Sequence, residues 1–564
     1  MSVEEKIILS AIQSPPKNEA EFGALKRNFI GKNKGESALP SKTSLLTAYH
    51  KLLKAKRIKR NLSLEKLLTR RSVRTLSGVT IITSLVKPYP CPGKCVYCPL
   101  DIRMPKSYLS EEPAAARALT LKFDPWKQMV KRIEALENNG HPTEKIELII
   151  KGGTWNSYPL AYQHWFILES FRAANGMPKK IPGSASLEKI RKELQKQQKL
   201  NEKSKHRIIG LTLETRPDSI SEKTLLQMRE QGCTRLELGV QHTDEEILKL
   251  VKRGHTVDQV KSAMRLAKNF GFKVDFHLMP MLPGATPEKD LAMLLEIFDN
   301  PAYRPDMIKI YPCSVVKGSE LYDWFQAGKF HSYPVEELVR ILKIFKSKVP
   351  DYVRISRLIR DIPGQLIETG NRITNLRQVI QAEMKAEGTF CRCLRCREVG
   401  HSPLLHRGEG RVRSRVDLSP KLFIEQYSAS GGTEYFLSFE DKQRQVVFAF
   451  CRLRICDRPL SGSLLCEGER DATLASTEER AGRGLASAAF IRELHTYGQL
   501  IRIGKYDKTS SQHQGLGKKL LKEAEKIAKK NHCAEINVIS GVGVRDYYRS
   551  LGYRLRKTYM VKKI

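Results

Sequence analysis

The feature that most constrains this chain is the stretch Cys91-Pro-Gly-Lys-Cys95-Val-Tyr-Cys98, which carries three thiols in the spacing C-x3-C-x2-C. Three cysteines on one short loop can each ligate one iron of a four-iron, four-sulfur cluster, and the fourth iron then lacks a protein ligand. An iron with an open position can bind and cleave a small molecule. The spacing therefore predicts a catalytic 4Fe-4S cluster on Cys91, Cys95 and Cys98.

Two simpler explanations of these cysteines are a zinc knuckle and a group of buried thiols. A structural zinc site usually has four ligands, and no further Cys or His lies within ~10 residues of the three. The chain begins MSVEEKIILS, without the basic start and long apolar stretch of a secretory signal. We therefore interpret the twelve cysteines as reduced thiols of a cytoplasmic protein. No apolar run reaches roughly 18 residues, so no membrane span is expected.

The charge balance indicates a polyanionic partner. Lys and Arg number 98 against 61 Asp and Glu, and residues 51–74 contain ten basic side chains and one acid, Glu65. A solubility feature and a solvated helix face are the simpler explanations, but the local concentration favours a surface that follows nucleic-acid phosphates. Residues 1–78 are therefore predicted to form a basic helical region, with Ser41 and Ser63 as N-caps of two helices.

Alternating strand-like and helix-like segments predict a full or partial (β/α) barrel over residues 79–360. The apolar runs of strand length are 79–86, 146–150, 207–214, 234–240, 273–279, 307–311 and 352–356. Active sites of such folds lie at the carboxyl ends of the strands, and the cysteine loop follows the first run. The polar, Lys- and Gln-rich segment 176–206 interrupts the rhythm and is expected to be an exposed helical insertion.

Residues 410–564 are predicted to form a separate α+β unit. Strand-like runs at 422–428, 446–455, 536–540 and 553–562 flank the turn Gln512-His513-Gln514-Gly515-Leu516-Gly517, which opens a helix over 518–530. A glycine turn at a helix start presents backbone N–H groups and the helix dipole to an anion. The order of strand, turn, helix and strand resembles the acetyl-CoA-binding layout of GNAT acetyltransferases, with the CoA pyrophosphate on the turn. Residues 456–486 are interpreted as a flexible loop.

A second cysteine group, Cys391, Cys393 and Cys396, lies in the segment 361–409 between these two units. Three thiolates so close together favour a metal over packing, and zinc suits such a site. The sequence thus predicts a structural zinc that holds the barrel to the next domain. Three residues remain open as the fourth ligand: His401, His406 and Cys313.

These motifs together resemble the catalytic subunit of Elongator and its stand-alone prokaryotic relatives, from about residue 75 to the end. The resemblance is carried by CVYCP (95–99), KGGTW (151–155), LTLETRPD (211–218), GCTRLELGVQ (232–241), RGHT (253–256), DIPGQLIETGNRITNLRQ (361–378), REVGH (397–401), RELHTYG (492–498), QHQGLGKKLL (512–521) and ISGVGVRDYYRSLGYRL (539–555). It implies an α/β fold class, with a partial TIM-like radical S-adenosylmethionine (SAM) barrel and an α+β GNAT domain.

The family is understood to build a carboxymethyl group on carbon 5 of the wobble uridine of tRNA. The resemblance therefore implies a 4Fe-4S cluster, SAM and acetyl-CoA as cofactors, and the tRNA anticodon stem-loop as the partner of the basic 1–78 region. The prediction of zinc rests on the second cysteine group and not on the resemblance, because this site is not intact in all eukaryotic relatives. The electron donor and the oligomeric state stay open.

The resemblance also implies residue roles. Its acetyl-CoA positions correspond to Lys145, Glu493, Leu494, His495, Thr496, Leu516, Gly517, Lys518 and Tyr548, and its catalytic positions to Tyr547, Tyr548 and His495. Its SAM positions correspond to Gly152, Gly153, Glu214, Arg216 and Gln241. From the residues alone, Lys145 is a surface lysine and Arg216 can equally be part of a structural ion pair.

The implied reaction has four steps. An electron from the reduced cluster cleaves SAM to methionine and a 5′-deoxyadenosyl radical, which takes a hydrogen atom from the acetyl methyl group. The carbon radical adds to uridine carbon 5, and the thioester is then hydrolysed. One alternative is a protein lysine acetyltransferase with Glu493 or His495 as base. Another is a non-catalytic tRNA-binding scaffold, against which the intact cysteines and glycines argue.

Overall fold

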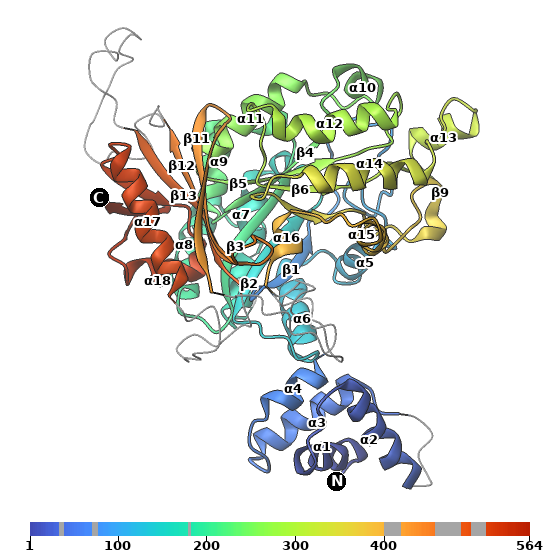
Figure 1. The fold of residues 1–564 in the computed structure, drawn as a ribbon, viewed down its shortest axis with the longest axis vertical. Helices are drawn as coiled ribbons and strands as arrows, with labels where there is room; N and C mark the ends of the chain where they lie inside the picture. The colour runs from blue at the N-terminus through green and yellow to red at the C-terminus, as the bar shows by residue number, and fades with distance from the viewer. Residues whose placement is uncertain (33–38, 70–76, 179–181, 400–418, 457–486, 498–514) are drawn as a thin grey trace.

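The structure is a computed structural model that describes residues 1–564 except 33–38, 70–76, 179–181, 400–418, 457–486 and 498–514. Three parts follow one another along the chain: a bundle of helices, a parallel sheet covered by helices, and a second, mixed sheet (Figure 1). The predicted flexible loop at 456–486, apart from Cys456, and the start of the glycine turn at 512–514 lie outside the described residues.

The N-terminal helices form a small bundle at one end of the molecule (Figure 1). They are α1 Val3–Gln13, α2 Glu19–Lys32, α3 Lys42–Lys54 and α4 Leu62–Leu68. Ser41 caps α3 as predicted, whereas the prediction of Ser63 as a cap was wrong. The side chain of Asn61 accepts the Leu64 N–H at the start of α4, which places Ser63 inside the first turn. Basic residues 54, 56, 57 and 59 are exposed where α3 ends.

Seven parallel strands form the predicted partial barrel, in the order β1-β2-β3-β4-β5-β6-β8. Their bounds are β1 Thr80–Leu85, β2 Lys145–Lys151, β3 Arg207–Thr215, β4 Arg235–Gln241, β5 Lys273–Leu278, β6 Met307–Ile310 and β8 Arg354–Arg357. Helices follow most strands and cover the outer face: α5 Pro113–Thr120, α6 Pro125–Glu137, α7 Leu160–Ala174, α9 Glu222–Glu230, α10 Glu245–Leu250, α11 Val257–Asn269, α12 Pro287–Asp299 and α14 Val335–Lys348. All seven predicted strands are present, because each apolar run is buried between these helices and the barrel interior.

The segment 176–206 is not an exposed insertion, which corrects that expectation. Its helix α8 (Leu187–Asn201) packs along α7 and buries Ile190, Leu194 and Asn201 on one face. The spacing of these residues follows the helical period, and the buried amides are satisfied. Gln198 Nε2 donates to the Glu230 carbonyl at 2.9 Å. The polar composition of this segment made it look exposed, although one face of α8 packs against α7.

The second sheet has the order β10-β11-β12-β13-β14-β16-β15. The bounds are β10 Lys421–Ala429, β11 Gly432–Glu440, β12 Val447–Cys456, β13 Ala488–Thr496, β14 Glu535–Val538, β15 Arg554–Arg556 and β16 Tyr559–Lys563. Helix α17 (Leu516–Lys530) packs on β12 and β13, and the short helix α18 (Arg545–Arg549) precedes β15. The parallel pair β13–β14 is joined only over 489–491 and 536–538, so β13 continues beyond its partner.

Buried ion pairs join the second sheet to the barrel. Arg492 on β13 donates to both oxygens of Asp306 at 2.5 and 2.7 Å and to Glu434 at 2.7 Å. Burial opposes the charge of Asp306, but Arg492 and Lys268 hold the pKa of this carboxyl well below its usual range. Charges this deep need such complete pairing, and these ion pairs join β13 to the barrel.

The chain passes from the barrel to the second sheet through short elements. Strand β7 (Ser314–Val316) pairs with β9 (Ile367–Gly370), and α15 (Leu376–Ala386) and α16 (Leu394–Arg397) follow; α13 (Glu320–Gln326) lies between β7 and α14. Within the described ranges, no helix combines the length and the apolar character needed to cross a membrane.

Candidate active site

One cavity of about 950 Å³ runs through the interior of the partial barrel to the second sheet. Its wall includes the three thiols of the cysteine loop, which follow β1 at the carboxyl edge of the barrel strands. The same wall includes Glu493 and His495 of β13 and Tyr548 of α18. The two sites predicted some 400 residues apart therefore face a single space.

The cysteine loop carries a thiolate that basic groups support. Arg253 Nη1 donates to Cys95 Sγ at 3.4 Å, and the Gly93 N–H donates to Cys91 Sγ at 3.4 Å. A hydrogen bond from Cys98 lowers the pKa of the Cys95 thiol to about 4, with Arg253 adding to the effect against the influence of burial. Thiolates are the form that ligates iron, so the chemistry of this loop fits a cluster.

The residues predicted to contact SAM lie beside that loop. Gly152 and Gly153 end β2 with φ angles of 145° and 86°. Glu214 ends β3 and accepts a hydrogen bond from Tyr108 Oη at 2.7 Å. Gln241 ends β4, and it lines the cavity together with Gly153 and Glu214. Gly152 is not in the wall, because it packs against Val86 behind it.

The sequence left two roles open for Arg216, a structural ion pair and a contact to SAM, and its surroundings suit both. Its guanidinium pairs with Asp218 at 2.9 Å and donates to the Arg253 carbonyl at 2.8 Å. Its remaining nitrogen, Nη1, is buried without a hydrogen-bond partner among the described residues, and a Cβ built on Gly93 would lie 2.5 Å from it. One side of Arg216 is structural, and the other faces the cysteine loop.

The residues predicted to bind acetyl-CoA converge where α17 begins. Gly515 has a left-handed φ of 71°, and Leu516, Gly517 and Lys518 form the first turn. A Cβ built on Gly517 would lie 3.1 Å from Tyr547 Oη and 3.5 Å from Thr496 Oγ1. The first backbone N–H groups of this helix, which have no intrahelical partner, thus lie beside the end of β13.

Glu493, Leu494, His495 and Tyr548 continue from this turn into the cavity wall, whereas Lys145 does not line the cavity. Lys145 begins β2, and burial lowers its pKa, so it is not a simple surface lysine.

Glu493 and His495 differ in what they can do with a proton. Burial raises the pKa of Glu493, but Lys273, at 3.5 Å, and Arg452, at 2.9 Å, outweigh it and bring the pKa to about 2. Such a carboxylate is a poor base. Burial lowers the pKa of His495, whose Nε2 lies 3.1 Å from the Ser77 carbonyl.

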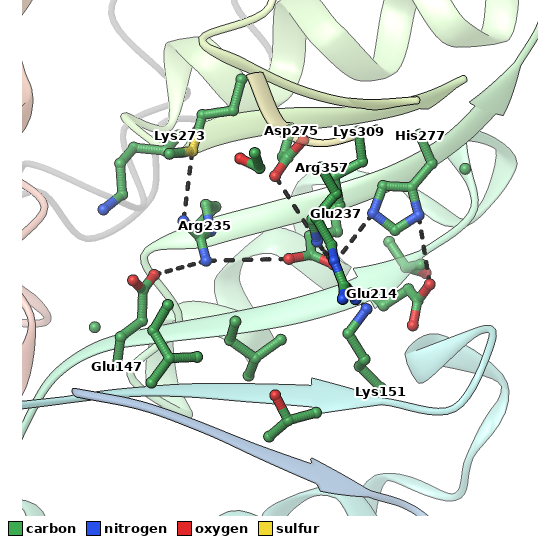
Figure 2. A pocket seen from close by; sticks show the side chains of 18 of the residues that line it. Glu147, Lys151, Glu214, Arg235, Glu237, Lys273, Asp275, His277, Lys309 and Arg357 are labelled. Carbon is green, nitrogen blue, oxygen red and sulfur yellow. Dashed lines mark hydrogen bonds and ion pairs between the residues drawn. The ribbon is translucent and has the colours of Figure 1, made fainter. Parts of the chain in front are cut away.

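Charged side chains fill the barrel interior between the two sites, and the sequence predictions missed them (Figure 2). Arg235 lies 2.8 Å from Glu147. Glu237 accepts from His277 Nε2 at 3.1 Å and pairs closely with Lys309. The sequence did contain an indication: charges recur at every second position of runs such as Lys273–His277, which places them on the inward face.

Glu214, Glu237 and His277 come within 4.8 Å of one another. Lys309 and Lys151 already supply positive charge to Glu237, the latter at 3.6 Å. The group is therefore a neutralised polar network.

Comparisons with known proteins agree with this geometry. The Radical SAM superfamily model matches residues 89–296, and the Radical_SAM C-terminal domain model matches 305–386. A tRNA uridine(34) acetyltransferase of Methanocaldococcus infernus is 42% identical over 506 residues, covering 88% of each chain. Elongator complex protein 3 of Homo sapiens is 37% identical over 504 residues, covering 87% of this chain and 85% of its own.

The chain belongs to the Elongator complex protein 3 family of radical SAM enzymes. A solved structure of the M. infernus Elp3 with its N-terminus deleted has a TM-score of 0.69 at 40% identity, and covers 87% of this chain and 100% of that one. This chain and the M. infernus Elp3 therefore share their fold over most of their length.

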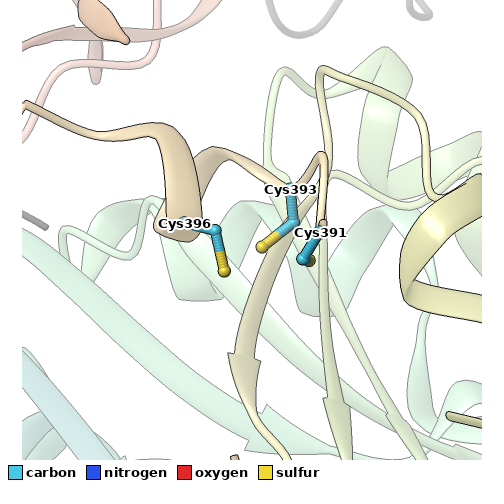
Figure 3. Close-up of side chains that lie close together, drawn as sticks. All are labelled: Cys391, Cys393 and Cys396. Carbon is cyan, nitrogen blue, oxygen red and sulfur yellow. The ribbon is translucent and has the colours of Figure 1, made fainter. Parts of the chain in front are cut away.

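In this family member the second cysteine group also converges. The sulfur atoms of Cys391, Cys393 and Cys396 lie within 4.8 Å of one another (Figure 3). Burial opposes ionisation of Cys393, but hydrogen bonds from the other two thiols bring its pKa well below the usual range. Cys313 is not part of this group among the described residues, and His401 and His406 lie outside them.

The segment that carries Cys391, Cys393 and Cys396 contacts both sheets. The N–H of Leu394 donates to the Val353 carbonyl of the barrel at 2.8 Å, and that of Val399 to the Val447 carbonyl of the second sheet at 3.2 Å. A metal held here would clamp both.

Proposed function

We propose that this enzyme builds a carboxymethyl group on carbon 5 of uridine 34 of tRNA, using a 4Fe-4S cluster, SAM and acetyl-CoA. The observation that carries the proposal is the single cavity lined by both the cysteine loop and the end of β13. Chemistry that joins two cofactors needs their reacting groups in one space. The relatives named tRNA uridine(34) acetyltransferase support tRNA as the substrate, and so a cytoplasmic reaction.

Cys91, Cys95 and Cys98 would hold the cluster, and Gly153, Glu214, Arg216 and Gln241 would contact SAM. When bound, these groups supply a radical that removes a hydrogen atom from an unactivated carbon. Within the protein, the hydrogen bond from Cys98 and the neighbouring Arg253 together lower the pKa of the Cys95 thiol. Arg216 Nη1 offers a buried donor toward the loop, as a ligand carboxylate requires.

The start of α17 would bind the CoA pyrophosphate through the N–H groups of Leu516, Gly517 and Lys518. Leu494 and Thr496 would line the pantetheine path, and Tyr547, Tyr548 and His495 would surround the thioester. Glu493 is already paired with two cations, Lys273 and Arg452. It would therefore orient its neighbours and would not act as a base that removes a proton. Lys145 begins β2 and does not line the cavity, so it would contact the coenzyme only outside this cavity.

Basic surfaces would hold the tRNA. The exposed basic residues 54–59 at the end of α3 suit phosphate contacts. Arg357, Arg360 and Arg395 line the cavity beside β8. Burial and the neighbouring Arg377 and Arg354 lower the pKa of Arg395 to about 10, so an anion bound there would relieve repulsion. A wobble base flipped out of a single-stranded loop can enter such a cavity.

Cys391, Cys393 and Cys396 would bind a structural zinc. Their convergence, and the low pKa of Cys393, suit a thiolate metal site. Such a site would stabilise the docking of the two sheets.

The test is Cys95→Ala in reconstituted protein given tRNA, SAM, reductant and acetyl-CoA. We expect the variant to lose 5′-deoxyadenosine and carboxymethyluridine, measured by mass spectrometry, while it still binds acetyl-CoA in calorimetry. Cys233→Ala, a buried thiol outside the cavity, is the control for a lost core thiol. Wild-type protein that forms carboxymethyluridine without 5′-deoxyadenosine would contradict the proposal.

A protein lysine acetyltransferase is less well supported. Direct acetyl transfer needs a base that accepts the proton of the amine. One of the two residues suggested for that role, Glu493, has a pKa of about 2 and is paired with Arg452 and Lys273.

A further inference from the structure

The barrel interior contains one carboxylate that no hydrogen bond satisfies. Asp275 lies on β5 and lines the cavity (Figure 2). The residue is fully buried, and both of its oxygens lack a hydrogen-bond partner among the described residues. The Lys309 ammonium is 3.9 Å from Oδ2. A buried, unsatisfied carboxylate destabilises a fold, so its presence points to a role.

The other carboxylates of the cavity wall are engaged. Each accepts a hydrogen bond through at least one oxygen: Glu112 from Arg360, Glu147 from Thr212, Glu214 from Tyr108, Glu237 from His277, Asp361 from Arg357, Glu398 from Arg354 and Glu493 from Arg452. Asp275 is therefore the wall carboxylate, among the described residues, of which neither oxygen accepts a hydrogen bond.

Along β5, Asp275 lies between a residue that contacts the second sheet and a residue paired with a strand position beside the cysteine loop. Lys273, two residues before it on β5, contacts Glu493 of the second sheet at 3.5 Å. His277, two residues after it, pairs in register with Gly239, whose carbonyl accepts from the Arg253 that supports the cysteine loop. Inward residues of a strand are about 7 Å apart. A thioester that extends from the β13 end of the cavity toward the cysteine loop would thus pass the position of Asp275 on β5.

We propose that Asp275 is the general base that activates water to hydrolyse the acyl–CoA thioester. The assignment rests on the proposed function and names the residue for its last step. The water oxygen bonds to the thioester carbonyl carbon as one water proton passes to the Asp275 carboxylate. The carbon–sulfur bond then breaks, and the departing thiolate takes the proton from Asp275. Thioester and water thus become a carboxylic acid and a thiol, without oxidant or reductant.

The charges around Asp275 are consistent with this role. Burial raises its pKa, with Glu237 acting in the same direction, while Lys309, His277 and Arg235 oppose the rise. A carboxylate with a raised pKa is a better base near neutral pH than one held by cations. Lys309 is also near enough to support negative charge on the carbonyl oxygen.

The experiment is Asp275→Asn, which preserves the shape of the side chain but cannot accept the proton. In reconstituted enzyme with all substrates, we expect 5′-deoxyadenosine at the wild-type rate and carboxymethyluridine reduced at least ~100-fold. The tRNA should instead accumulate as a thioester adduct with CoA, detected by mass spectrometry of its nucleosides. Carboxymethyluridine at the wild-type rate, or loss of 5′-deoxyadenosine and product without an adduct, would overturn the assignment.

A second measurement does not depend on the cluster. Protein prepared without iron is given acetyl-CoA and tRNA, and release of free thiol is followed with a chromogenic reagent. We expect Asp275→Asn to release thiol at least ~10-fold more slowly than wild type, with equal acetyl-CoA affinity in calorimetry. Equal release by both proteins would overturn the assignment.

Asp290→Asn is the matched control for this measurement, because Asp290 is a buried barrel aspartate outside the cavity wall. It should leave thiol release unchanged. If wild-type enzyme forms no 5′-deoxyadenosine, the proposed function fails, and thiol release still tests Asp275.

Discussion

Gly152, directly after β2 at the carboxyl edge of the barrel, has no room for a side chain. Its φ of 145° lies in the region that L side chains rarely adopt, and a Cβ there would come within 2.1 Å of Val86 Cγ2. Glycine is needed for conformation and for space. The backbone of the KGGTW stretch can therefore pass close to the end of β1 and to the cysteine loop beyond it.

We expect Gly152→Ala to lower the free energy of unfolding by roughly 2–4 kcal/mol, since backbone strain and overpacking each contribute. Chemical denaturation followed by circular dichroism measures the change. Gly176→Ala, at a φ of 71° with nothing within 4 Å, isolates the backbone effect and should cost about 1 kcal/mol. If the double variant Gly152→Ala/Val86→Ala recovers part of the lost unfolding free energy, the contact with Val86 is the cause of that loss. An equal loss for Gly152→Ala and Gly176→Ala would contradict this contact.

At the scale of elements, the N-terminus of α17 shows how a local pattern becomes a binding surface. Gly515 supplies the left-handed turn, and Gly517 lets the first helical turn approach Tyr547 and Thr496. Fifteen residues of helix follow the first N–H groups, and the dipole of such a helix favours a bound anion at its N-terminus.

Gly517→Ala should weaken acetyl-CoA binding about tenfold, because the added methyl group narrows the approach to the turn. Isothermal calorimetry measures the affinity. The helix itself should not suffer, since alanine has the higher helix propensity, and the melting temperature checks this. Unchanged affinity would argue that the pyrophosphate binds elsewhere, and Lys526→Ala, farther along α17 and paired with Glu523, is the control for a helix substitution.

Elements also differ in how well the sequence predicted them. The seven barrel strands are continuous apolar runs, and a parallel sheet buried on both faces requires such runs. Strand β11 was missed, because its identity depends on pairing with β10 across the turn at 430–431. Helix α8 was taken as exposed, because Gln and Asn on its buried face looked polar. Their hydrogen bonds, from Gln198 to the Glu230 carbonyl and from the Ile208 N–H of β3 to Asn201, exist only in the folded chain.

On the scale of the whole molecule, the docking of the two sheets creates the cavity. Arg452, Arg454 and Arg492 of the second sheet are all buried, and each is paired with an acid. Removing one partner from such a set leaves an uncompensated charge. The distance between the cysteine loop and the CoA turn thus depends on this network.

Glu493 makes the docking sensitive to acid. Burial raises the pKa of Glu493, but Lys273 and Arg452 outweigh this effect and lower the pKa to about 2. The ion pairs of Glu493 therefore stabilise the fold above the unfolded-state pKa near 4.5. This contribution, roughly 3 kcal/mol by linkage, is lost as the pH falls from about 4.5 through about 2.

Glu493→Gln should therefore cost most at pH 7, and the difference from wild type should shrink as the pH falls from 5 to 3. Urea unfolding at each pH measures both proteins. Glu188→Gln, at an exposed position on α8, should show no such trend. A difference that stays constant from pH 7 to pH 3 would contradict the assigned ion pairing.

By itself, the sequence determined the chemistry that depends on near neighbours. Cys91, Cys95 and Cys98 share a loop because eight residues cannot place them far apart. A glycine turn before an amphipathic helix likewise leaves the first N–H groups of the helix without an intrahelical partner. Only the tertiary structure decided what depends on distant segments. Asp275 and Lys309 meet because successive strands turn alternate residues inward, and both cofactor sites face one cavity because buried ion pairs dock two sheets. Such contacts join residues far apart in the chain, and their burial and pairing exist only after folding.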